Sequence, residues 1–356
     1  MIKTKLRNLV TEYSLRNRNG SCTDVYSVTN SQGFIPSTDY FSKEVFSKDL
    51  TTYKIVKKGM IAYNPSRINV GSVAVQRVAE EVIVSPLYVV FSVNEDELIP
   101  EYLTYFLHSD KGLHQISSNT SGSVRDSLKF TALQNIEINT YSLEEQKEII
   151  VKFQKFERLI EKQKALLKKL DDLVKSQFIE MFGDPIRNTQ KRVTTEFINV
   201  VKMQRGFDLP VQERVQSGNV LVFGSNGALD RHNVAKVLGG GVITGRSGTI
   251  GKVFYTEEDY WPLNTSLFSV DTHGNNIIFL AYLLQLYDLT RFTEGTGVPT
   301  LNRNKFHNQQ IIDVPLDEQN AFARFVKQTD KSKFRIKQSL EKLEKCYKAL
   351  LQKYFG

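Results

Sequence analysis

The sequence contains few of the residues that build disulfide frameworks and structural metal sites. Only two cysteines, Cys22 and Cys346, and five histidines occur among its 356 residues. Two cysteines cannot form a disulfide framework or a four-cysteine zinc site, and the histidines show no spacing typical of metal ligands. We therefore expect a reduced, cytoplasmic environment for this chain and no bound metal ion.

Long apolar runs are missing as well. No stretch approaches the roughly 18–20 consecutive apolar residues that cross a bilayer. Residues 1–7 are not followed by the apolar core of a signal peptide. With 40% hydrophobic and 11% aromatic residues, the chain is instead typical of a folded protein without a membrane segment, and it is long enough for two ordinary domains.

The motifs of enzymes that act on nucleotides or DNA are incomplete. Residues 245–252 resemble a phosphate-binding loop, but Arg246 replaces its first glycine and Val253 replaces the hydroxyl residue that binds magnesium. The Asn-Pro-Ser at 64–66 lacks the second proline and the aromatic residue of DNA adenine methyltransferases. We find no dinucleotide-binding glycine motif and no convincing nuclease cluster. We predict that the chain is not an enzyme and holds no cofactor or catalytic residue of its own.

What the sequence does contain is a long internal repeat. Residues 142–183 return at 315–356 without a gap, and Leu-Glu-Glu-Gln at 143–146 matches Leu-Asp-Glu-Gln at 316–319, an offset of 316 − 143 = 173 residues. This period is far longer than the roughly 20–50 residues of a solenoid repeat. The pattern predicts two similar halves, each a globular region followed by a long repeated segment. The expected domains are 1–141, 142–183, 184–314 and 315–356.

Each repeated segment has the pattern of a long helix. Apolar residues of 143–182 recur at alternating steps of four and three, which is typical of a coiled coil. Ser142 and Glu145 fit a capping box at the start, and Gly183 followed by Pro185 is typical of a helix end. We expect the two helices to pair antiparallel within the chain, because each is attached at one end to a globular region. Pairing with another protein, or between two copies of the chain, stays open.

The globular regions have the pattern of mixed α/β folds with short strands. Strands are expected at 59–63, 82–84, 219–223, 241–244 and 251–255, and helices at 101–107 and 277–286. The expected fold class is α/β (α+β), with two mixed α/β regions joined and separated by the two antiparallel helices in a pseudo-twofold arrangement. Residues of the helices that we expect to dock other subunits are Leu159, Leu166, Leu173, Phe182 and Phe355.

Positive charge is not spread over the globular regions. The whole chain carries +8, but counting Lys and Arg against Asp and Glu gives 15 − 14 = +1 for 1–141 and 12 − 11 = +1 for 191–314. The second repeated segment, 315–356, carries 10 − 5 = +5. A surface for nucleic acid on the globular regions would therefore have to be local.

Several loops combine glycine with Asn, Ser, Thr and Arg. Glycine allows the backbone to approach a phosphate, and Asn and Arg side chains can form paired hydrogen bonds with adenine and guanine edges. The alternative is that these loops are only the turns of a loop-rich domain. The candidate DNA contacts are Asn64, Arg67, Asn69, Arg125 and Lys129 in the first half, and Asn226, Arg246, Lys252, Asn302, Arg303 and Lys305 in the second half.

In combination, these segments resemble the specificity subunit of type I restriction-modification systems, over the whole chain. Besides the motifs that open the two helices, the similarity lies in residues 181–185, 222–227, 244–253, 261–265 and 302–306. The first half departs from the family pattern. It has Gly-Met-Ile-Ala-Tyr-Asn at 59–64 in place of the Gly-Arg-Ser-Gly loop that the second half has at 245–248. This difference fits a different recognition class.

The resemblance implies a non-catalytic subunit in the cytoplasm of a bacterium or archaeon. Each globular region would read one half of a bipartite double-stranded DNA target, while the helices set the spacing. Two modification subunits would clasp the helices, bring S-adenosylmethionine and methylate adenine at N6. A restriction subunit that uses ATP and magnesium can join them. Two other functions stay open: a coiled-coil scaffold without DNA readout, and a self-sufficient DNA methyltransferase or nuclease.

Overall fold

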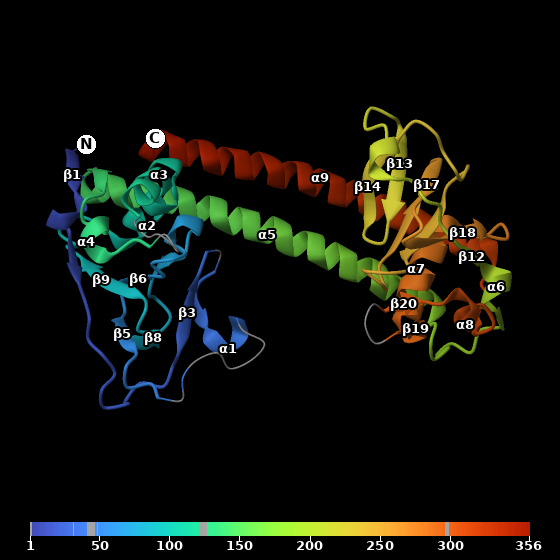
Figure 1. The fold of residues 1–356 in the computed structure, drawn as a ribbon, viewed down its shortest axis with the longest axis horizontal. Helices are drawn as coiled ribbons and strands as arrows, with labels where there is room; N and C mark the ends of the chain where they lie inside the picture. The colour runs from blue at the N-terminus through green and yellow to red at the C-terminus, as the bar shows by residue number, and fades with distance from the viewer. Residues whose placement is uncertain (1, 31, 41–46, 48, 121–126, 296–298) are drawn as a thin grey trace. The chain divides into compact units, whose positions relative to one another are not determined.

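The computed structural model describes every residue except 1, 31, 41–46, 48, 121–126 and 296–298. It divides into two compact units, Met1–Gln163 with Ser339–Gly356, and Lys164–Gln338. Each unit contains one globular region and one end of each long helix (Figure 1). Within the described ranges, no helix has a stretch long and apolar enough to span a membrane. The four domain boundaries expected from the repeat stay a prediction.

A four-stranded antiparallel sheet lies in each globular region, and the two sheets have the same strand order. In the first unit the order is β2 (Val10–Glu12), β9 (Val89–Val93), β6 (Ile61–Tyr63) and β7 (Val73–Val75). In the second it is β12 (Lys202–Arg205), β18 (Ser266–Asp271), β15 (Gly241–Gly245) and β16 (Val253–Thr256). In both sheets, the strand that comes first in the sequence lies at one edge, beside the strand that comes last. The two halves therefore share one frame.

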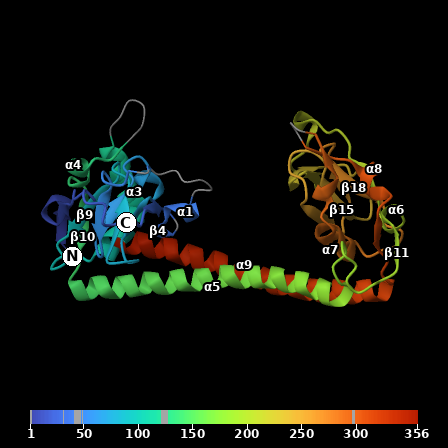
Figure 2. The same cartoon turned by 90° about the horizontal axis from the view of Figure 1, so that it is seen from below.

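Further elements occur in equivalent pairs around the two sheets. Helix α2 (Pro100–His108) packs on β7. Helix α7 (Ile277–Tyr287) packs on β15 and β16, and Figure 2 shows α7 near β15. The pairs that complete the shared frame are β1 (Ile2–Lys5) with β10 (Glu137–Thr140), β11 (Thr194–Glu196) with β21 (Gln310–Ile312), and the short helices α4 (Phe130–Leu133) and α8 (Arg303–His307). Phe130 of α4 and Phe306 of α8 are both buried.

The remaining elements differ between the two regions. The first region adds β3 (Tyr26–Thr29), β4 (Gly33–Pro36), α1 (Ser37–Tyr40), β5 (Lys54–Lys57), β8 (Glu81–Val84) and α3 (Asp110–Asn119). The second adds α6 (Phe197–Val200), β13 (Val220–Gly224), β14 (Gly227–His232), β17 (Tyr260–Pro262), β19 (Thr293–Glu294) and β20 (Thr300–Leu301). The halves thus differ in what surrounds the common sheet.

The strands and helices expected from the sequence are present, with ends that shift by one or two residues. Two strands begin later than expected, β6 after Gly59 and β16 after Gly251. Both glycines have φ of +92°, a left-handed conformation that cannot continue a strand. Each glycine therefore belongs to the turn that leads into its strand.

The two repeated segments form helices of 40 residues each, α5 (Leu143–Phe182) and α9 (Leu316–Phe355). The capping box at the start of α5 is confirmed: the backbone N–H of Ser142 donates to Glu145 Oε2 at 3.0 Å, and the N–H of Glu145 donates to Ser142 Oγ at 3.3 Å. Gly183 ends the helix with φ of +78°. Both repeated segments are therefore helical over almost their whole length.

The two helices pair antiparallel in each unit, as predicted. In the first unit, Lys152 Nζ of α5 donates to Tyr354 of α9 at 3.1 Å, and Glu157 accepts from Tyr347 at 2.9 Å. A higher residue number on α5 therefore meets a lower one on α9. The same holds in the second unit, where Asp171 pairs with Lys333 at 2.7 Å and Phe178 packs on Phe322 with ring centroids 5.4 Å apart.

A buried glutamine explains the repeated motif at the start of the two helices. The side-chain oxygen of Gln146 accepts from the N–H of Ile99 at 2.9 Å, and that of Gln319 accepts from the N–H of Asn276 at 2.8 Å. Ile99 and Asn276 are the N-cap residues of α2 and α7. Each glutamine therefore ties a long helix to the start of the helix that packs on the sheet.

The docking role predicted for Phe182 and Phe355 is corrected by their burial. Phe182 packs on Phe279 of α7 at 5.2 Å, and Phe355 packs on Tyr102 of α2 at 5.1 Å. Both side chains are completely or almost completely buried. They anchor the ends of α5 and α9 in the cores of the globular regions, so their rings are not available to another subunit.

Candidate nucleic-acid interface

The candidate loops of the two halves occupy the same place in the shared frame. Residues 64–72 connect β6 to β7, and residues 246–252 connect β15 to β16. Arg67 and Asn69 are exposed on the first loop, and Lys252 is exposed on the second. The segment where the first half departs from the family pattern therefore leads into a loop that is topologically equivalent to the Gly-Arg-Ser-Gly loop.

In the first region, the structure brings the first loop close to the start of α4. The N–H of Leu128 donates to the carbonyl of Pro65 at 3.1 Å, which places the exposed Lys129 beside the loop. Asn64 is half-buried, and its side-chain oxygen accepts from the N–H of Ser66 at 3.1 Å, a turn-forming bond. Arg125 lies outside the described residues.

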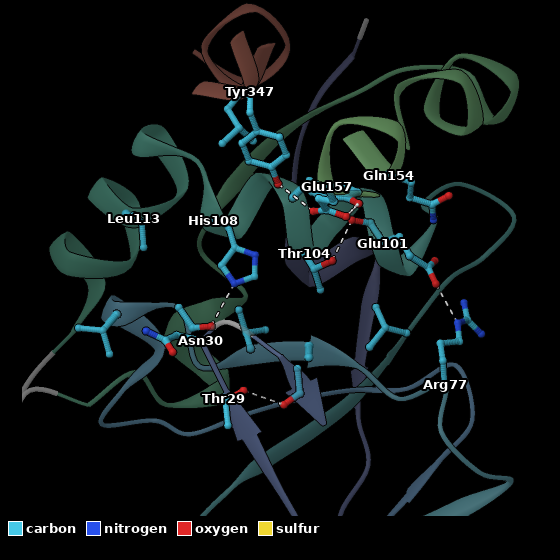
Figure 3. A pocket seen from close by; sticks show the side chains of 18 of the residues that line it. Thr29, Asn30, Arg77, Glu101, Thr104, His108, Leu113, Gln154, Glu157 and Tyr347 are labelled. Atoms are coloured by element: carbon cyan, nitrogen blue, oxygen red, sulfur yellow. Dashed lines mark hydrogen bonds and ion pairs between the residues drawn. The ribbon is translucent and has the colours of Figure 1, made fainter. Parts of the chain in front are cut away.

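Asn69 is one of the residues that line a cavity of about 770 Å³. Helices α2, α5 and α9 contribute Glu101, Glu157 and Tyr347 to its wall (Figure 3). At its wall, Glu157 of α5 accepts hydrogen bonds from the hydroxyls of Tyr105 and Tyr347, both at 2.9 Å. Burial, and next the Glu157 carboxylate, raise the pKa of both tyrosines, so both hydroxyls stay protonated donors. Because α2, α5 and α9 each supply one of these groups, the cavity wall is held rigidly.

In the second region, two of the candidate loops contact each other. Lys252 Nζ donates to Asn226 Oδ1 at 2.8 Å, which links the loop before β16 to the turn between β13 and β14. Arg246 leaves β15 at the other end of the same loop, and its guanidinium donates to the carbonyl of Asn264 at 3.4 Å. The loop is therefore fixed at both ends.

Three arginines of the second region line one cleft of about 310 Å³. Arg205 comes from the end of β12, Arg246 from the loop after β15, and Arg303 from α8. A neighbouring hollow of about 560 Å³ shares Arg205 and Arg303. Among the residues that the structure describes, none of the three guanidinium groups forms an ion pair with a carboxylate. Their charge is available for a ligand.

Glu294 also lines this cleft and engages two of the predicted contacts. Its carboxylate accepts from Lys305 Nζ at 2.5 Å and from Asn302 Nδ2 at 2.9 Å. These bonds, that of Lys305 first, lower the pKa of Glu294, so it is ionised at neutral pH. The side-chain oxygen of Asn302 in turn accepts from the N–H of Asn304 at 3.1 Å and caps α8.

A buried histidine connects the two elements that carry Arg303 and Arg205. His307 Nε2 accepts from the backbone N–H of Met203, next to Arg205 on β12, at 3.1 Å. Burial lowers the pKa of His307, and the positive charges of Arg303 and Lys202 lower it further. The ring is therefore neutral at neutral pH, and it connects α8 to β12 without adding charge to the cleft.

Arg205 and Glu294 were not among the residues singled out from the sequence. Arg205 ends a strand rather than lying in a glycine-rich loop, and an acidic side chain was not expected in a basic site. The candidates Asn302, Arg303 and Lys305 were found because they share one short segment. The packing of α8 against β12 brings Arg205 to that segment, and nothing in the local sequence shows that packing.

Each unit also has a groove where its sheet meets a long helix. The cavity with Glu157 is one of them, and in the second unit Asp330 of α9 accepts from Tyr255 of β16 at 3.3 Å in a groove of about 590 Å³. Glu157 and Asp330 are related by the repeat offset, since 330 − 157 = 173. The rim of the second groove carries Phe334, whose side chain is 61% exposed.

The three leucines predicted to dock other subunits lie on the surface of α5. Leu159 is 38%, Leu166 42% and Leu173 47% exposed. In the described part of the chain, no group of three or more His, Cys, Asp or Glu residues is arranged to hold a metal ion.

Comparison with known proteins identifies the family. Residues 14–172 and 185–345 match the model of the type I restriction modification DNA specificity domain. The solved type I restriction-modification system S subunit from M. genitalium is 15% identical with a TM-score of 0.61, over 100% of this chain and 96% of that one. A chain from a structural study of complex assembly and conformational transition in the type I R-M system is 16% identical with a TM-score of 0.62, over 99% and 97%.

At these identities the two solved structures show a shared fold. No curated protein sequence matches the chain. The family model, in contrast, covers most of the chain in two copies, one for each globular region and the helix that follows it. This chain therefore belongs to the family of type I restriction-modification DNA specificity domains, and it carries two of them.

Proposed function

We propose that this chain is the non-catalytic DNA-recognition subunit of a type I restriction-modification enzyme. Each globular region reads one half of a bipartite DNA target, and the paired helices set the distance between the halves. The observation that carries the proposal is the shared frame: two sheets of one topology present unlike loops, 64–72 and 246–252, at the same place. A frame used twice with different surfaces suits two different half-sites.

The side chains of these surfaces suit double-stranded DNA. In the first region, Arg67 and Lys129 are exposed on two segments that contact each other. In the second region, three arginines without carboxylate partners line the cleft. Arginine is the side chain best able to contact both phosphates and guanine edges. Asn64, Asn69, Asn226 and the Gly-Arg-Ser-Gly loop supply further contacts.

The long helices dock two modification subunits, one on each half of the repeat. The exposed leucines of α5 and the two equivalent grooves at Glu157 and Asp330 provide two related surfaces for two copies of one partner. These partners bring S-adenosylmethionine and carry out the N6-methylation of adenine. ATP and magnesium belong to a restriction subunit that joins the complex.

The test is co-expression of the full chain with its modification subunit, followed by mapping of N6-methyladenine in the host genome. We expect a new methylated motif made of two short blocks separated by a fixed number of unspecified bases. A stable complex of the two proteins that methylates no such motif would contradict DNA recognition by this chain. Failure to form any complex would contradict the docking role and favour a scaffold for other proteins.

A further inference from the structure

The cleft of the second region presents charged hydrogen-bond donors beside one carboxylate. The guanidinium groups of Arg205, Arg246 and Arg303 are the donors, and the ionised Glu294 carboxylate is the acceptor. Three positive charges without carboxylate partners repel one another, so the cleft favours a ligand rich in acceptor atoms. A carboxylate has room for further donors after Lys305 and Asn302 are bound.

This arrangement matches a base pair better than it matches a phosphate group. A phosphate offers only acceptors, so it can accept from the arginines but has no donor for the Glu294 carboxylate. In the major groove a G·C pair offers the O6 and N7 acceptors of guanine beside the N4 amino donor of cytosine. The cleft offers the complementary set.

Arg205 is the arginine best placed to make the specific contact. Arg246 is held by the carbonyl of Asn264, and Arg303 lies half-buried beside His307. Arg205 is exposed at the end of β12, and within the described part of the chain its side chain makes no hydrogen bond. Its planar fork is therefore free to form the paired bonds that guanine accepts.

We infer that the second region reads a G·C base pair in this cleft, with Arg205 on the guanine and Glu294 on the cytosine. The inference rests on the proposed function, and it adds the identity of one base pair and of the two residues that read it. The second block of the methylated motif then contains a G·C pair whose recognition depends on Arg205.

The experiment compares genome-wide N6-methyladenine for the full chain with that for Arg205→Ala, Arg205→Lys and Glu294→Gln, each co-expressed with the modification subunit. Lysine keeps the charge of Arg205 but loses its planar two-pronged geometry, so it preserves a phosphate contact and weakens the paired contact with guanine. We expect both Arg205 variants to relax the same G·C position of the second block, with a loss of discrimination of roughly 5- to 150-fold, and to leave the first block unchanged. Glu294→Gln should relax that position as well.

Three outcomes would overturn the inference while leaving the proposed function intact. One is a bipartite motif whose second block has no G·C pair. Another is full activity of Arg205→Lys together with a sequence-independent loss in Arg205→Ala, which would assign Arg205 to a phosphate. The third is an unchanged motif in every variant. A wild-type chain that forms the complex but gives no bipartite motif would instead contradict the proposed function itself.

Discussion

His307 shows how one buried side chain in the second region makes stability depend on pH. Because its pKa is lowered in the folded state, the unfolded chain takes up a proton first, at its ordinary pKa of about 6.5. The free energy of unfolding therefore contains this contribution in full above that pH. It decreases as the pH falls below about 6.5, until the folded protein is protonated as well.

We expect His307→Gln to reduce this acid sensitivity. The glutamine side-chain oxygen can accept the Met203 N–H that Nε2 accepts in the native protein, but it does not titrate. The measurement is the melting temperature between pH 7.5 and pH 5. The melting temperature of the native chain should fall more on acidification than that of His307→Gln. The control is His114→Gln, at an exposed position of α3, and it should behave like the native chain. Parallel curves for the native chain and His307→Gln would show that His307 is not responsible.

At the residue scale, site residues are predicted best from the sequence when they lie close together in one short segment. Asn302, Arg303 and Lys305 were found together for this reason, whereas Arg205 joins them only through the packing of α8 against β12. Phe182 and Phe355 were placed correctly at the helix ends but assigned the wrong environment. Their burial depends on α7 and α2, which approach them only in the folded chain.

Among the elements, one buried glutamine ties the start of each long helix to its globular region. Gln319 accepts from Asn276 N–H and donates to the side chain of Asn275 and the carbonyl of Val314, at 2.8, 2.6 and 2.7 Å. We expect Gln319→Leu to lower the free energy of unfolding of the second unit by about 1–3 kcal/mol, because buried polar groups lose their partners.

Trp261, the only tryptophan, lies in this unit and reports its unfolding in urea by fluorescence. The matched control is Gln328→Leu, at an exposed position of the same helix, and it should change stability by less than about 0.5 kcal/mol. Equal effects of the two substitutions would refute a tethering role for Gln319.

The groove at α9 leads to a second prediction at the element scale. Phe334 is 61% exposed on the rim, so its removal should hardly affect the stability of the free chain. If a modification subunit covers the groove, Phe334→Ala should weaken the complex by about 1–3 kcal/mol, since aromatic side chains often dominate interfaces. Calorimetric titration with the purified modification subunit measures this.

Leu238→Ala is the control, because Leu238 is 75% exposed in the loop between β14 and β15 and does not line the groove. Equal affinity of native and Phe334→Ala chains would remove this groove from the docking surface.

Helix pairing was predictable here because the heptad pattern is local in sequence. The grooves were not, because they form only where an edge of the sheet meets a helix.

For the whole molecule, the duplication predicts that the two halves act independently on DNA. Each region has a hydrophobic core of its own, one around Phe91 and Phe106 and the other around Phe279 and Phe306. The repeat revealed this duplication in the helices alone. The common topology of the sheets was not predictable from the sequence, because many different sequences are compatible with the same pattern of buried and exposed strand positions.

We expect Arg67→Ala to affect only the first half-site and Arg246→Ala only the second. Arg67 lies between β6 and β7 and Arg246 between β15 and β16, in separate units without a shared partner. Substitutions at independent sites add to within about 0.3–0.5 kcal/mol. The double variant should therefore lose the sum of the two single losses in binding free energy.

The measurement is titration of the assembled complex with duplexes at one fixed salt concentration, because phosphate contacts make affinity strongly dependent on salt. A loss in the double variant well below the sum would mean that the halves read DNA as one coupled surface, and the reuse of a single frame would then not imply two independent readers.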